Sequence, residues 1–295
     1  GLHNDPLFDA LYHAKGRLRV IHARHEQASA YMALGAALAT GKPQAFAVVP
    51  GPGFLNASAA MLSAYAMNAP VLGIVGQIFQ ADIDRGFGHL HELRDQIGLA
   101  SHFTKYTARI GAPHEAPEIG NAAIASMMTG VPRPAFIECG MDTWAKMGAV
   151  ELAAPARVKR PPVDRELVAA AARILGAAER PLIVVGGGAQ DASAEVTALA
   201  EMLEAPVAAF RRGHGVVSAR HRLAINLPIS HRLWKTADVV LAIGTRLHWQ
   251  QANWGLDDNI KIVRIDVDPD TPDRFKRAAA GMVGDARDYT AALLE

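Results

Sequence analysis

Short apolar segments alternate with helix-like segments along the whole chain, and this alternation restricts the fold more than any other feature of the sequence. The apolar segments are strand-sized and bounded by Gly or Pro, which is typical of parallel strands covered on both faces. In the first half we expect strands at residues 18–22, 45–49, 71–76, 105–110 and 135–139, and helices at residues 5–14, 24–40, 56–66 and 113–128. This pattern predicts an α/β fold.

The same alternation restarts after a proline-containing segment near the middle of the chain. Residues 151–163 carry three prolines and no apolar period, so we interpret them as a linker. Beyond them we expect helices at residues 164–178 and 192–203, and strands at residues 182–185, 207–210, 239–243 and 262–267. The sequence therefore predicts two doubly wound, mainly parallel α/β domains, at residues 1–150 and 164–295.

The composition excludes several classes of protein. With 295 residues and a formal net charge of +1, the chain offers no electrostatic attraction for nucleic acid or for an anionic membrane. No apolar run approaches the length of a membrane span, and no signal peptide is visible. The single cysteine, Cys139, excludes an internal disulfide framework and fits a reducing, cytoplasmic location. We interpret it as a small core residue.

Two positions attract attention before any family is considered. Glu26 stands where the first expected strand runs into a helix, close to the carboxyl end of a strand, where open α/β sheets build their sites. Position alone favours a solvated glutamate, stabilised in the first helical turn by the helix dipole. Residues 50–56, Pro-Gly-Pro-Gly-Phe-Leu-Asn, predict a tight turn. Its glycines permit close approach of a ligand, and Asn56 is placed to cap the following helix.

Several short motifs occur in a fixed order along the chain: His25-Glu26-Gln27, Gly51-Pro52-Gly53-x-x-Asn56, Thr104-Lys105, Gly186-Gly187-Gly188, Gly244-Thr245-Arg246 and Ile265-Asp266-Val267-Asp268-Pro269. In order and spacing they resemble the acetolactate synthase-like thiamine diphosphate enzymes. Each motif alone is weak, but together they cover nearly the whole chain. The resemblance implies a pyrimidine-binding domain at residues 1–150 and a Rossmann-like central domain at residues 164–295.

The resemblance implies that Glu26 is the catalytic residue. In this family a carboxyl bonded to N1′ of the aminopyrimidine favours its imino form, and the cofactor then removes the proton from its own thiazolium C2. Such a role requires a carboxyl that can hold a proton near neutral pH, which burial away from cations provides. We therefore expect Glu26 to be buried and to have a raised pKa.

The resemblance also places other residues on the thiamine side. Pro52 and Asn56 match residues that lie beside the pyrimidine ring. His91 stands where the family usually has the glutamine of a Phe-Gln-Glu triplet, although a surface histidine in the loop at residues 78–93 fits equally well. Gln77 ends an expected strand, and we expect it either to face the cofactor or to close a turn.

In some relatives the central domain binds flavin, so FAD is a second candidate cofactor. Its candidate residues are Gly186, Gly187 and Gly188, which we expect at a helix N-terminus, together with Arg246 and Asp266. A glycine-rich turn that opens a helix suits a pyrophosphate. The full dinucleotide fingerprint is absent, however, and a purely structural domain is the alternative.

The family's third domain, which binds the diphosphate and its Mg2+ through a Gly-Asp-Gly…Asn motif, has no counterpart in this sequence. We therefore expect the metal ligands to lie outside this chain, the first strand of the N-terminal domain to be missing, and the chain alone to be inactive. In the family the site lies between two subunits, so the resemblance implies a homodimer or homotetramer.

The predicted function is that of a thiamine diphosphate-dependent transferase or lyase acting on a small-molecule 2-oxo acid. Pyruvate is the family's commonest donor, and acetolactate synthase-like carboligation and decarboxylation both remain open. One alternative is a non-catalytic nucleotide-binding or regulatory subunit. Another is one half of a split enzyme, completed by a separate polypeptide that carries the magnesium site.

Overall fold

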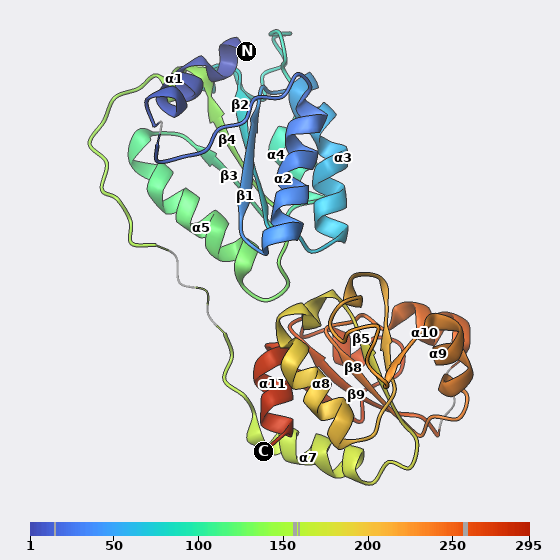
Figure 1. Cartoon of the computed structure of the whole chain (residues 1–295). Helices are drawn as coiled ribbons and strands as arrows, with labels where there is room; N and C mark the ends of the chain where they lie inside the picture. Colours follow the sequence, from blue (N-terminus) through green and yellow to red (C-terminus); the bar gives the residue numbers. More distant parts are fainter. Residues whose placement is uncertain (15, 156–157, 159, 256–258) are drawn as a thin grey trace. The chain divides into compact units, whose positions relative to one another are not determined.

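All strand pairs in the computed structural model of the chain are parallel where the structure is described, and they form two separate sheets. The described residues are 1–14, 16–155, 158, 160–255 and 259–295. They divide into two compact units, Gly1–Lys159 and Arg160–Glu295, each built on one sheet (Figure 1). The predicted fold class, two parallel α/β units, is confirmed. The predicted linker at residues 151–163 falls partly outside the described residues.

The first unit contains a four-stranded sheet in the order β1-β2-β4-β3. Helices α2 and α3 cover one face of this sheet and α5 covers the other (Figure 1). Strand β4 lies inside the sheet, and all of its residues are buried. The elements are η1 (Leu2–Asn4), α1 (Asp5–His13), α2 (Glu26–Thr40), β1 (Gln44–Val48), α3 (Pro52–Ala66), β2 (Val71–Gln77), η2 (Gln80–Asp82), α4 (Gln96–Ser101), β3 (Tyr106–Ile110), η3 (Pro113–Glu115), α5 (Ala116–Met128), β4 (Ala135–Gly140) and α6 (Met141–Trp144).

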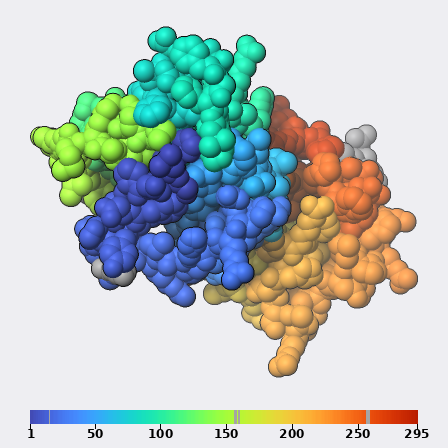
Figure 2. Space-filling model, turned by 90° about the horizontal axis from the view of Figure 1, so that it is seen from above, coloured from blue at the N-terminus to red at the C-terminus, as the bar shows by residue number. Residues whose placement is uncertain are grey.

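The strand predicted at residues 18–22 is wrong. Only Leu18 forms an isolated bridge, and the residues that follow are irregular. Leu18, Val20 and Ile21 are 58%, 56% and 55% exposed, and the segment lies at the surface of the first unit, in dark blue in Figure 2. An apolar run becomes a strand only where a neighbouring strand pairs with it. Here the sheet ends at β1, and residues 19–22 join no ladder.

The second unit contains a six-stranded sheet in the order β7-β6-β5-β8-β9-β10, which is the Rossmann arrangement. Helices α7, α8 and α11 pack on one face, and α9 and α10 on the other. The short strands β7 and β10 were not predicted. The elements are α7 (Arg165–Gly176), β5 (Pro181–Val185), η4 (Gly187–Ala192), α8 (Ser193–Met202), β6 (Val207–Ala209), η5 (Arg211–Gly213), β7 (Ala224–Ile225), α9 (Leu227–Trp234), β8 (Val239–Ile243), α10 (His248–Trp254), β9 (Lys261–Asp266), η6 (Thr271–Asp273), β10 (Ala280–Val283) and α11 (Ala286–Leu293).

The turns that follow β5 and β8 approach each other so closely that their backbones touch. Gly188 N donates a hydrogen bond to Gly244 O at 3.0 Å. A Cβ atom on Gly186 would lie 2.4 Å from Gly244 O, and one on Gly188 would lie 2.9 Å from Gly244 Cα. The close contact between the two backbone segments is enough to explain why positions 186 and 188 are occupied by glycine.

We expect Gly186→Ala to destabilise the second unit by about 1–3 kcal/mol, because the new methyl group meets backbone that cannot move aside. Gly176→Ala is the matched control, since a Cβ atom at this helical position finds nothing within 4 Å. The control should be neutral or slightly stabilising. Urea unfolding of both variants checks this, and equal stabilities would contradict the close contact between the turns.

Candidate active site

Glu26 is the first residue of α2, and local signals fix where this helix begins and ends. The backbone N–H of Gln27 donates to Nδ1 of His25, which caps the helix at 3.2 Å. The helix ends at Thr40, and its C-cap Gly41 has a φ of 66°, which glycine adopts without the steric cost of a side chain. Asn56 Nδ2 on α3 donates to Glu26 Oε2 at 3.1 Å. The structure thus brings together Glu26 and Asn56, two of the predicted site residues.

The environment of Glu26 differs from the expected one. The side chain is half-buried rather than enclosed. Its pKa is lowered, first by the hydrogen bond from its own backbone N–H and also by the amide of Asn56, while desolvation acts in the opposite direction. The expected raised pKa is therefore wrong for this structure. A carboxylate at an open helix N-terminus meets hydrogen-bond donors that favour its charged form.

The turn at residues 50–53 carries the other predicted thiamine-side residues. Gly51 has a φ of 56°, and α3 begins directly after it, at Pro52. Asn56 therefore lies inside α3, and the prediction that it caps a helix is wrong. Pro52 and Asn56 are both exposed and share one helix face through their i, i+4 spacing. A Cβ atom on Gly53 would lie 2.6 Å from Val49 Cγ2, so this glycine lets the turn pack closely against Val49; Glu26 Cγ would lie at an ordinary contact distance of 3.6 Å.

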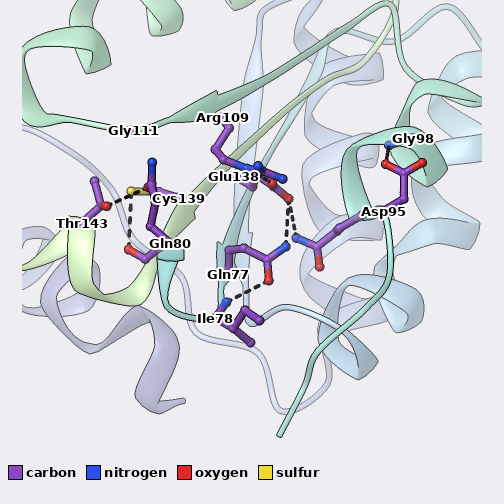
Figure 3. Close-up of polar contacts among 12 residues, drawn as sticks. Gln77, Ile78, Gln80, Asp95, Gly98, Arg109, Gly111, Glu138, Cys139 and Thr143 are labelled. Atoms are coloured by element: carbon purple, nitrogen blue, oxygen red, sulfur yellow. Dashed lines mark hydrogen bonds and ion pairs between the residues drawn. The ribbon is translucent and has the colours of Figure 1, made fainter. Parts of the chain in front are cut away.

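A buried polar cluster, which we call the Glu138 cluster, was not predicted. It consists of Gln77, Gln96, Arg109 and Glu138 (Figure 3). Glu138 is fully buried, and its Oε1 lies 2.6 Å from Arg109 Nε. Its Oε2 accepts hydrogen bonds from Gln96 Nε2 at 2.8 Å and Gln77 Nε2 at 3.4 Å. Burial raises the pKa of Glu138, whereas Arg109 and the two amides oppose that rise.

Gln96 connects the Glu138 cluster to the candidate site. Its Oε1 accepts a hydrogen bond from Gly51 N at 3.1 Å, and its Nε2 also donates to Gly76 O at 3.2 Å. The side chain of Gln77 points into the cluster, and its Oε1 accepts from Ile78 N at 2.8 Å. The available sequence signal was a charged residue within the apolar strand β4. Its partners come from distant parts of the chain and gave no local signal.

His91 lies against the turn at residues 50–53. His91 belongs to the loop at residues 86–92, which is folded around one carboxylate. Glu92 accepts hydrogen bonds from the backbone N–H groups of Gly86, Gly88 and His89 at 2.9, 2.6 and 2.9 Å. His91 itself has a φ of 70°, and a Cβ atom on Gly51 would lie 2.6 Å from its carbonyl oxygen. His91 is half-buried, and its place on the thiamine side stays a prediction beside the alternative of a surface histidine.

In the second unit the candidate flavin residues lie near the carboxyl ends of β5, β8 and β9. Gly186 is the N-cap of the 3-10 helix η4, which begins at Gly187, and the α-helix α8 starts only at Ser193. Arg246 is exposed, and its carbonyl oxygen accepts from Arg264 Nη1 at 3.4 Å. Asp266 accepts from Asp268 N at 3.0 Å, and burial raises the pKa of its carboxyl.

Three further observations limit the chemistry. No group of three or more His, Cys, Asp or Glu side chains among the described residues is placed to hold a metal ion. None of the helices in the described ranges is long and apolar enough to cross a bilayer. Cys139 is buried, and burial raises the pKa of its thiol to about 12, so the thiol stays protonated.

The fold is that of an α/β protein, and the hydrogen-bonded pair of Glu26 and Asn56 lies near the carboxyl edge of its first parallel sheet, where such proteins commonly build their sites. Two family models match the chain: the N-terminal TPP binding domain of the thiamine pyrophosphate enzymes over residues 1–99, and their central domain over residues 168–293. The chain belongs to the thiamine pyrophosphate enzyme family and carries these two domains. The family resemblance inferred from the motifs is confirmed.

Curated relatives support this assignment. The chain is 34% identical over 289 residues to the probable 2-ketoarginine decarboxylase AruI of Pseudomonas aeruginosa, covering 94% of this chain and 51% of that protein. It is 33% identical over 311 residues to the probable acetolactate synthase large subunit of Methanocaldococcus jannaschii, covering 98% and 52%. The chain therefore spans about half the length of the curated relatives it matches.

A solved structure supports the fold. A putative thiamin diphosphate-dependent enzyme from Mycobacterium smegmatis superposes with a TM-score of 0.85 at 21% sequence identity. The match covers 100% of this chain and 58% of that one. At this level of identity the similarity concerns the fold alone.

Proposed function

We propose that this chain forms the pyrimidine side of a thiamine diphosphate site in an enzyme that decarboxylates a 2-oxo acid and either releases the remaining fragment after protonation or transfers it to a carbonyl acceptor. The observation that carries the proposal is the hydrogen bond between Asn56 and Glu26, beside the turn at residues 50–53. Relatives named as a decarboxylase and as an acetolactate synthase support both forms of the reaction.

The residues present fit an aminopyrimidine. Asn56 bonds to one oxygen of Glu26, Oε2, and the half-buried carboxylate keeps an edge that can accept an N–H from a ring nitrogen. The hydrogen bond from Asn56 fixes the orientation of that edge. A planar ring on this edge would remove water from Glu26 and raise its pKa towards the value that proton exchange requires.

Thiamine diphosphate supplies the nucleophilic carbon and the electron sink that the reaction of a 2-oxo acid needs. The contribution of this chain is to orient the pyrimidine and to hold or release a proton at the Glu26 carboxyl. In the family a Gly-Asp-Gly…Asn motif holds the Mg2+ and the diphosphate, and we assign these ligands to a different part of the enzyme or to a partner subunit, because this sequence does not carry the motif. We also propose that the enzyme is a homo-oligomer and that the second unit binds FAD.

The test measures carbon dioxide release from pyruvate and from 2-ketoarginine by the whole enzyme, including the part that supplies the Mg2+ and diphosphate ligands, with thiamine diphosphate and Mg2+. We expect turnover that requires the added cofactor. A second measurement needs no turnover: NMR of the Asn56 side-chain amide during titration with thiamine. The amide resonance should shift, because the ligand contacts its hydrogen-bond partner, Glu26. If the Asn56 resonance did not shift during the titration and the enzyme showed no cofactor-dependent turnover, the proposed function would be contradicted.

A further inference from the structure

The side-chain amide of Gln96 lies between a buried ion pair and the turn at residues 50–53. Its Nε2 donates hydrogen bonds to Glu138 Oε2 at 2.8 Å and to Gly76 O at 3.2 Å, and its Oε1 accepts one from Gly51 N at 3.1 Å. Gln96 is only 1% exposed, so water cannot take the place of these partners. Both N–H groups of the amide are thus used, and its oxygen faces the turn.

These three partners permit only one orientation of the amide. The carboxylate of Glu138 and the carbonyl of Gly76 can only accept a hydrogen bond, whereas Gly51 N can only donate one. The ion pair with Arg109, at 2.6 Å, favours the charged, accepting form of Glu138. Methionine has a similar length but neither polar group, and an ionised glutamate has no donor for Glu138. Position 96 therefore requires a side chain that carries both a donor and an acceptor at this length.

Gly51, which receives the oxygen of this amide, is the N-cap of α3 and has no side chain with which to cap that helix. Its carbonyl accepts the first hydrogen bond of the helix, from Leu55 N at 2.9 Å. The backbone there has a φ of 56°, and a Cβ atom would lie 2.6 Å from His91 O, so the turn is tightly confined. Because Gln96 fixes the N–H of the same residue, it holds the start of α3 in place.

We propose that Gln96 is a positioning residue for Glu26. It holds Gly51, and with it the start of α3, so that Asn56, one turn further on, keeps its hydrogen bond to Glu26 Oε2 at 3.1 Å. This inference rests on the proposed function and names a residue that acts on the carboxylate through α3, without touching substrate or cofactor. The buried ion pair between β3 and β4 anchors Gln96 itself. Support of this kind from buried hydrogen bonds is what a preorganised site requires.

The direct test is NMR of this chain without cofactor, with Gln96→Met as the variant. Methionine fills a similar space but removes the hydrogen bond to Gly51. We expect the resonances of the Gly51 backbone amide and of the Asn56 side-chain amide both to shift. Thr143→Val is the matched control, because it removes another buried hydrogen bond of the first unit, to Gln80 Oε1 at 3.0 Å, and should leave both resonances unchanged. An Asn56 resonance that stays as in the wild type overturns the proposal.

Gln96→Glu tests the need for both a donor and an acceptor without a change in side-chain length. Two carboxyls at hydrogen-bond distance share one proton, so one pKa of the pair is raised. At low pH the protonated carboxyl donates its O–H to Glu138, and its other oxygen accepts from Gly51 N, as the amide does. At high pH both carboxyls are charged and this arrangement is lost. Arg109, paired with Glu138, opposes the rise in pKa.

We therefore expect the Gly51 and Asn56 resonances of Gln96→Glu to match the wild type at about pH 5 and Gln96→Met at about pH 9, since buried carboxyls can reach pKa values of about 8–9. Thermal unfolding of each variant shows that it is folded at the pH of the measurement. Gln96→Glu keeps the test decisive if Gln96→Met does not fold. A difference from the wild type that does not change with pH overturns the proposal.

Kinetics of the whole enzyme with thiamine diphosphate and Mg2+ separate this proposal from the proposed function. Gln96→Met should lower kcat by up to about 100-fold, the cost of a misplacement of about 1 Å, and should change KM for pyruvate much less, because Gln96 does not contact the substrate. Thr143→Val should behave as the wild type. A wild-type kcat in folded Gln96→Met would refute the positioning role but leave the proposed function standing. Shifts of both resonances in Gln96→Met, without cofactor-dependent turnover in the wild type, would support the positioning of Asn56 and count against the proposed function.

Discussion

Replacing Glu26 with glutamine should lower kcat/KM by about 10²–10⁴-fold, the usual contribution of a positioned acid–base group. Glutamine keeps the size of the side chain and can still accept the hydrogen bond from Asn56, but it cannot take up or release a proton at the pyrimidine. The folded structure should persist because the side chain is only half-buried and the substitution leaves its size unchanged. The measurement is steady-state carbon dioxide release together with the thermal unfolding midpoint.

Glu118→Gln is the matched control for this experiment. Glu118 also lies in the first turn of a helix of the first unit, α5, and is exposed, so it shares the helix-dipole environment of Glu26 without its partner Asn56. This control should keep full activity. If Glu26→Gln retained wild-type turnover, the assignment of Glu26 as the proton-exchanging group would be wrong.

Replacing Arg109 with leucine should destabilise the first unit by about 3–5 kcal/mol at neutral pH, because it leaves the buried charge of Glu138 without a partner. Native-state hydrogen exchange of the β4 amides measures the stability of the first unit separately from that of the second. The exposed pair of Arg222 and Glu204, at 2.7 Å, provides the contrast. Arg222→Leu should cost at most about 1 kcal/mol, as surface ion pairs do.

The Arg109→Leu defect should shrink as the pH falls. Burial already raises the pKa of Glu138 in the folded protein, and loss of the guanidinium raises it further. A carboxyl whose folded pKa lies above its unfolded value binds protons more tightly when folded, so stability is highest below the unfolded pKa. That stability is lost as pH rises through the folded pKa. A destabilisation that is independent of pH would contradict the role assigned to the buried Glu138 charge.

Much of the fold could be predicted because its signals are local. The segments that became β1, β2 and β4 are apolar runs bounded by Gly or Pro, and each forms a strand within a residue or two of its predicted bounds. The segment at residues 18–22 also contains Leu, Val and Ile, but it finds no strand to pair with. Pairing is decided by distant parts of the chain, which a local pattern does not contain.

In the candidate site, too, local motifs could be predicted, whereas contacts between distant segments could not. Glu26 and Asn56 were predicted through motifs, and the structure joins them with a hydrogen bond. The connection from Glu138 to Gln96 spans 42 positions along the chain, and no pattern within either segment announces it. The lowered pKa of Glu26 was missed for a related reason, because it depends on the donors around the carboxylate in three dimensions.

The loop at residues 86–92 has a consequence for how such a protein can diversify. Three of its backbone N–H groups are satisfied by Glu92 within the loop itself, and none of these bonds involves the sheet. The loop backbone is therefore held by its own hydrogen bonds, and a different side chain at position 91 would occupy the same place beside Gly51. A substitution at position 91 can therefore change this surface of the first unit without altering the buried core of the sheet.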